Sequence, residues 1–205
     1  GGNVQVTAAL NNTRGSYDFS ASDDIDLDAN IEADGAIALQ SDSDGAGGGE
    51  IEVNAAALTS GTDMDLTGPV TLNVDSVLTS ENGNIFVANP ITGAGANLDV
   101  VAADGIASLN ELSVLSLDVN ADAAELRGNI TTAAGNVNIQ DNAADGVATL
   151  LNDVVVSTDD GAGDVTFGDL EGQNDLTIDA GTGSIILNGG DIGALTIQDA
   201  TVATD

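Results

Sequence analysis

Aliphatic and polar residues alternate in short runs along the whole chain. Each run reads aliphatic, polar, aliphatic, and this period of two is typical of a short β-strand with one buried face. The i, i+3, i+4 spacing of an amphipathic helix is not sustained over any long window. The pattern therefore predicts many short strands and very little helix. Clear examples of the runs are Val4-Gln5-Val6, Ile25-Asp26-Leu27, Ile37-Ala38-Leu39, Ile51-Glu52-Val53, Leu98-Asp99-Val100 and Leu176-Thr177-Ile178.

The segments around these runs repeat as well. Residues 102–109 (AADGIASL) recur almost unchanged as residues 143–150 (AADGVATL). Units of two runs joined by a glycine turn begin at Ile25, Ile51 and Leu72. A repeat of roughly 20–26 residues without helices is typical of a β-solenoid, in which no single coil can bury its apolar face alone.

The chain is therefore predicted to be one all-β domain, residues 1–205, folded as a β-solenoid of about eight to ten coils. At the ~4.8 Å spacing of paired strands, the rod would be about 40–50 Å long. No Pro- or Ser-rich linker divides the sequence. The alternative is a set of antiparallel β-sandwich domains, which also use short alternating strands. Sandwich cores normally contain Trp or Tyr, and this chain has no Trp and one Tyr.

Charge narrows the possible functions. The sequence has 34 acidic residues and two basic ones, Arg14 and Arg127, with no His and no Cys, so its formal net charge is −32. With only two cationic side chains it cannot bind nucleic acid by neutralising phosphates. It also lacks histidine bases, Schiff-base lysines and thiol nucleophiles. We expect no enzymatic activity, no nucleic-acid partner and, since no apolar stretch approaches ~20 residues, no membrane insertion.

Several glycine-containing segments resemble the repeats of filamentous-haemagglutinin-like exoproteins. These segments are Gly83-Asn84-Ile85-Phe86-Val87, Gly135-Asn136-Val137-Asn138-Ile139, residues 130–136 and residues 174–185. The resemblance is diffuse and covers most of the chain from about Ile25 onward. It implies a right-handed parallel β-helix, secretion to the outside or surface of a bacterial cell, and a structural part in a long adhesin. An extracellular or high-salt setting also suits the charge, because cations screen the self-repulsion of such a surface.

Two acidic, glycine-rich turns are candidate Ca²⁺ sites, since Ca²⁺ takes six to eight oxygen ligands from carboxylates and backbone carbonyls. Their spacing does not match an EF-hand, and Asp and Gly also occupy solvated turns for conformational reasons alone. Both interpretations stay open, so the predicted cofactor is none or Ca²⁺. The candidate ligands are Asp42, Asp44 and Glu50 in the first turn and Asp159, Asp160 and Asp164 in the second.

Three apolar residues break the alternation and are expected to face outward. They are Phe86, Val155 and Ile186, each in the middle of a run of apolar residues. On a highly charged rod, an outward apolar side chain indicates contact with another chain or with another segment of the same chain. A loop that covers the face is the competing explanation.

The two ends of the solenoid are the other candidate interface. An open coil exposes unpaired backbone groups and apolar core, and no capping helix is evident. Either the chain is a segment of a longer rod, or neighbouring copies close its ends. The N-terminal strand around Val4 and Val6 is therefore expected to meet the C-terminal strand around Leu195 and Ile197 of a neighbour or of adjoining repeats.

These observations predict a structural extracellular protein, either an adhesin stalk or the subunit of a surface filament assembled through strand stacking. The expected partner is a further copy of the chain or adjoining repeats. The alternative is a calcium-dependent module that binds a glycan or protein on a host or cell surface.

Overall fold

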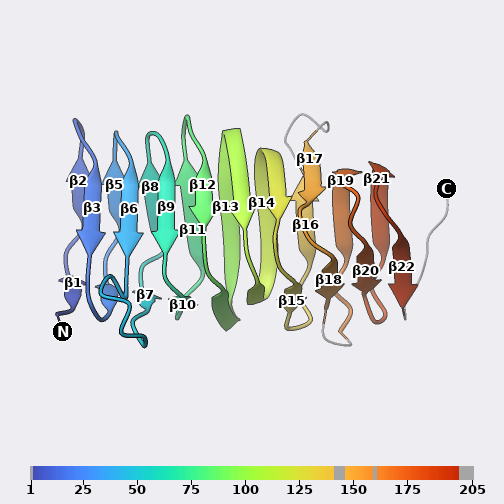
Figure 1. Ribbon diagram of the computed structural model, residues 1–205, viewed down its shortest axis with the longest axis horizontal. Helices are drawn as coiled ribbons and strands as arrows, with labels where there is room; N and C mark the ends of the chain where they lie inside the picture. The colour runs from blue at the N-terminus through green and yellow to red at the C-terminus, as the bar shows by residue number, and fades with distance from the viewer. Residues whose placement is uncertain (1, 141–145, 159–160, 199–205) are drawn as a thin grey trace.

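In the computed structural model, the residues described are 2–140, 146–158 and 161–198. Within these ranges the chain contains 22 strands and no helix. The strands wind into a β-solenoid of about nine turns, which lie side by side along the long axis of the molecule (Figure 1). The predicted fold is confirmed.

The first four turns each contain three short strands. They are β1 (Val4–Val6), β2 (Leu10–Asn12), β3 (Tyr17–Ser20), β4 (Ile25–Leu27), β5 (Ile31–Ala33), β6 (Ile37–Gln40), β7 (Ile51–Val53), β8 (Ala57–Ser60), β9 (Met64–Thr67), β10 (Val70–Leu72), β11 (Ser76–Ser80) and β12 (Ile85–Val87).

In the next two turns the three strands merge into one long strand that bends round the whole turn, and the later turns divide again. These strands are β13 (Ile91–Leu109), β14 (Leu112–Leu126), β15 (Ile130–Thr132), β16 (Val137–Gln140), β17 (Val147–Leu150), β18 (Val154–Ser157), β19 (Val165–Glu171), β20 (Leu176–Asp179), β21 (Ile185–Asp191) and β22 (Leu195–Gln198).

Each strand pairs in parallel with its counterparts in the turns before and after it, which gives three faces. Face 1 carries β1, β4, β7, β10, β15, β18, β20 and β22, face 2 carries β2, β5, β8, β11 and β16, and face 3 carries β3, β6, β9, β12 and β17. The long strands β13 and β14 contribute to all three faces, and β19 and β21 contribute to faces 2 and 3. Every pairing among the described strands is parallel, so the antiparallel sandwich is ruled out.

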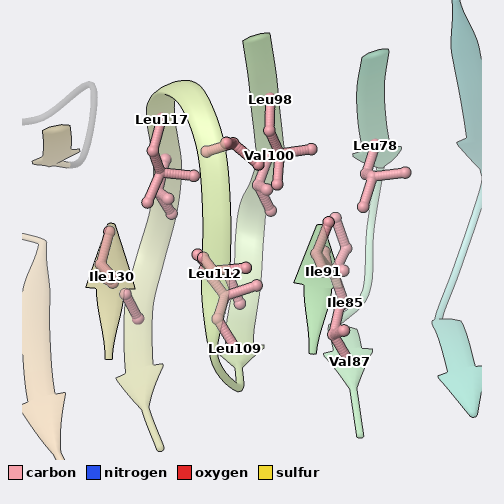
Figure 2. Close-up of a cluster of buried hydrophobic side chains, with 14 of the residues drawn as sticks. Leu78, Ile85, Val87, Ile91, Leu98, Val100, Leu109, Leu112, Leu117 and Ile130 are labelled. Atoms are coloured by element: carbon pink, nitrogen blue, oxygen red, sulfur yellow. The ribbon is translucent and has the colours of Figure 1, made fainter. Parts of the chain in front are cut away.

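The core consists of columns of aliphatic side chains, one from each turn. Away from the two ends of the rod, the inward residues of the predicted runs are buried, and in the middle turns they fill the space between the faces (Figure 2). Burying one such side chain contributes about 1.5–3 kcal/mol, so the stacked columns hold the turns together. One column on face 1 contains Val4, Ile25, Ile51, Val70, Ile91, Leu112 and Ile130.

Candidate functional site

The acidic and amide residues at the corners bind the turns to one another. On the corner between faces 1 and 2, the Asp75 Oδ1 accepts a hydrogen bond from the Asn97 N–H at 2.8 Å. The same contact recurs further along the rod, where the Asn136 Oδ1 accepts from the Asp164 N–H at 2.9 Å and the Asp164 Oδ1 accepts from the Ser184 N–H at 2.8 Å. Each side chain thus pairs a backbone donor that the strand ladder leaves unused.

Outward amides lie beside outward carboxylates of the neighbouring turn. The Asn11 amide donates to Glu32 at 2.8 Å, the Gln5 amide donates to Asp28 at 2.9 Å, and the Asn138 amide donates to Asp118 at 3.1 Å. These charge-assisted bonds are stronger than neutral ones. These carboxylates are therefore bonded across the turns.

The structure does not gather the first predicted calcium turn into one site. The Asp42 Oδ1 accepts from the Gly47 N–H at 2.8 Å, and the Asp44 Oδ1 accepts from the Ala46 N–H at 3.0 Å, so both carboxylates bond to their own loop. The Glu50 carboxylate instead accepts the Thr71 hydroxyl at 2.7 Å, toward β10.

The second predicted calcium turn is only partly described. Asp159 and Asp160 lie outside the described residues, while Asp164 accepts from the next turn as noted above. Within the part of the chain that the structure describes, no group of three or more His, Cys, Asp or Glu residues is arranged to hold a metal ion. Ca²⁺ binding therefore stays a prediction.

A surface cavity of about 740 Å³ runs across the strands of face 2, beside the row of corner side chains that accept backbone N–H groups of the next turn, here called the corner ladder. Two rows of side chains that carry oxygen atoms line this cavity along the rod. Burial raises the pKa of Asp99, and the nearby carboxylates of Asp118 and Asp75 raise it further. Sequence reasoning missed this cavity, although one polar residue per repeat was a visible signal. The two rows include Asp75, Asn97, Ser116, Asn136 and Asp164, and Asp99, Asp118, Asn138 and Thr166.

A second acidic cluster lies on face 1 where β4 and β7 pair. Asp26 and Glu52 are register partners on these strands. Burial raises the pKa of Glu52, and the charges of Asp26, Glu50 and Asp24 raise it further. Here carboxylates stack directly on carboxylates, which is unfavourable on a sheet surface.

Phe86 faces outward, as predicted, but its ring is covered from within the chain. The Arg127 guanidinium lies 5.5 Å from the centre of the Phe86 ring, which is the geometry of a cation–π contact. Arg127 is held there by the Glu125 carboxylate at 2.8 Å and by the Ser108 hydroxyl at 2.8 Å. The hydrogen bond from Arg127 lowers the pKa of Glu125 and outweighs the opposing effect of burial. For Phe86, the expected contact is therefore made by another segment of the same chain, and no second chain is needed to explain it.

The remaining interface candidates differ from one another. Val155 and Ile186 are exposed on faces 1 and 2, with 42% and 49% of their surfaces accessible. At the C-terminal end, Leu195 and Ile197 are also exposed. At the N-terminal end, Val6 is buried and Val4 is half-buried, so this end exposes less of its face-1 strand than expected.

No described helix is long and apolar enough to cross a membrane. Comparison with known proteins found no match to this chain among family models, curated sequences or solved structures.

Proposed function

We propose that this chain is a structural, extracellular rod, acting as an adhesin stalk or as the subunit of a surface filament. The observation that carries the proposal is the corner ladder. In it, side-chain oxygens of residues such as Asp75, Asn136 and Asp164 accept hydrogen bonds from backbone N–H groups of the next turn. Such residues stiffen a rod along its axis, and together with the aliphatic columns they make each turn a template for the next.

The acidic surface fits the same role. A net charge of −32 keeps rods apart and soluble when few cations are present, and screening by salt or divalent cations lets them approach. The proposed role is mechanical, because a stiff rod would hold an attached domain or partner at a distance.

Surface labelling tests this proposal directly. Antibodies raised against the purified chain are applied to cells of the source organism before and after permeabilisation. Labelling of intact cells is expected. Label that appears only after permeabilisation would refute the extracellular assignment, whatever the assembly state of the chain.

A further inference from the structure

The two ends of the solenoid differ in shape at corresponding positions of face 3. At the N-terminal end, the inward side chains of β3 are Tyr17 and Phe19, whose rings stack with centroids 5.7 Å apart. Both rings are only partly buried where they pack on the core. This end therefore presents a pair of large aromatic side chains.

The column that begins at Tyr17 ends at a residue with no side chain. Successive register partners from one turn to the next are Tyr17, Ile37, Met64, Ile85, Ala107, Ala124, Ala148, Leu170 and Gly190. Around Gly190 lies a cavity of about 390 Å³, whose lining combines the apolar side chains of Leu170, Leu187, Ile192 and Leu195 with small residues and Asp191. In this column the N-terminal end therefore carries the Tyr17 ring, whereas the C-terminal end has a cavity beside Gly190.

We propose that a second copy of this chain docks head to tail on this end, with Tyr17 of one copy entering the cavity beside Gly190 of the other. This inference rests on the proposed function and gives the filament a specific joint. Continuing the register of face 3 places Asp18 beside Asp191, and continuing face 2 places Leu10 beside Leu187. The joint repeats the step between any two turns, about 4.8 Å in the strand-pairing direction.

Two features favour this occupant over an unrelated protein. The strands at both ends run in the same direction, so the edge of β21 and β22, which pairs with no later described strand, can pair with the N-terminal edge of β1, β2 and β3. The exposed Leu195 and Ile197 continue the inward columns of face 1, so docking would bury them. A contact of this heterologous kind does not close on itself, and it therefore generates a filament.

One feature opposes the joint and makes it conditional. Asp18 and Asp191 would stand side by side as like charges, which is unfavourable on paired strands. Salt screens such a pair, so assembly is expected to increase with ionic strength.

Disulfide trapping in high salt tests the register, because the chain has no cysteine of its own. The Asp18→Cys, Asp191→Cys double variant places two thiols on neighbouring parallel strands, within the Cα separation that a disulfide allows. We expect a ladder of multimers on a non-reducing gel that collapses on reduction. The control variant, Asp18→Cys with Thr196→Cys, places the second thiol outward on face 1 and should give about tenfold less cross-linked multimer.

Filling the cavity provides a second, independent measurement. Gly190→Leu should raise the concentration needed for assembly by about tenfold, which corresponds to about 1.4 kcal/mol. The control is Gly95→Leu, which adds the same side chain at a position open to solvent. Circular dichroism of both variants confirms that each is folded.

The possible outcomes separate this inference from the proposed function. Equal cross-linking by the matched and mismatched pairs, or unchanged assembly of Gly190→Leu, would overturn the joint even if filaments form. A chain that stays monomeric in high salt would also overturn it. None of these three results affects the surface labelling, whose failure alone would refute the extracellular role.

Discussion

The carboxylate stack between β4 and β7 predicts that removing one acid will stabilise the protein. Asp26 and Glu52 are direct register partners, so their charges are separated by about the ~4.8 Å strand spacing. In bulk water, two like charges at that distance repel by about 0.9 kcal/mol. Screening reduces this to about 0.5 kcal/mol at 0.15 M salt and about 0.2 kcal/mol at 1 M salt. Glu50 and Asp24 add to the repulsion.

The variant Glu52→Gln keeps the shape of the side chain and removes the charge. At pH 7 and low salt we expect it to be more stable than the wild type by about 1 kcal/mol, or about 2–4 °C in melting temperature for a chain of this size. The matched control is Glu32→Gln. Glu32 also faces outward, but it accepts a hydrogen bond from the Asn11 amide, so its neutralisation should leave the melting temperature unchanged or lower it.

Thermal unfolding followed by circular dichroism measures both variants in low and high NaCl and in CaCl₂ at matched ionic strength. Salt should raise the melting temperature of the wild type more than that of Glu52→Gln. Equal gains from Na⁺ and Ca²⁺ indicate screening, and a surplus with Ca²⁺ indicates specific sites. If Glu52→Gln and Glu32→Gln shift the melting temperature in the same direction by the same amount, the assignment of repulsion to this stack is wrong.

Three further predictions concern the fold. Gly68 has φ +135°, so Gly68→Ala should destabilise by about 1–3 kcal/mol in urea unfolding, whereas Gly95→Ala should be neutral or slightly stabilising. Arg127→Met removes the cation over Phe86 and should cost about 1 kcal/mol. Because the folded pKa of Glu125 is lowered, its contribution is complete above its unfolded pKa and is lost as the pH falls through the folded value. The stability difference between wild type and Arg127→Met should therefore shrink in acid, and a constant difference would contradict this.

The strands could be predicted from sequence because alternation directly reports which side chains are buried. Ile25 and Leu27, for example, are fully buried with Asp26 between them, as the pattern required. The merging of strands in β13 and β14 could not be predicted, since it depends on how the corners bend and leaves no separate composition signal.

The corner residues were harder to interpret because their partners lie a whole turn away. Sequence reasoning considered Asp164 a calcium ligand or a solvated turn residue, whereas its carboxylate accepts the Ser184 N–H. Phe86 was recognised as outward, but its partner Arg127 comes from a later turn. Contacts between turns depend on the register of the whole solenoid, which local residue types do not specify.

The same principle explains how a chain of net charge −32 can fold into a compact stack. Asp75 and Asp164 accept backbone N–H groups, and Glu32 and Asp118 accept amide donors, so these charges contribute bonds between turns. The cost of the charge is thereby concentrated where acids stack on acids, as between β4 and β7. The proposed joint would add one more such stack at every contact between copies. We therefore expect cations to affect stability and assembly mainly where acids stack on acids, and single neutralising substitutions such as Glu52→Gln to separate the two effects.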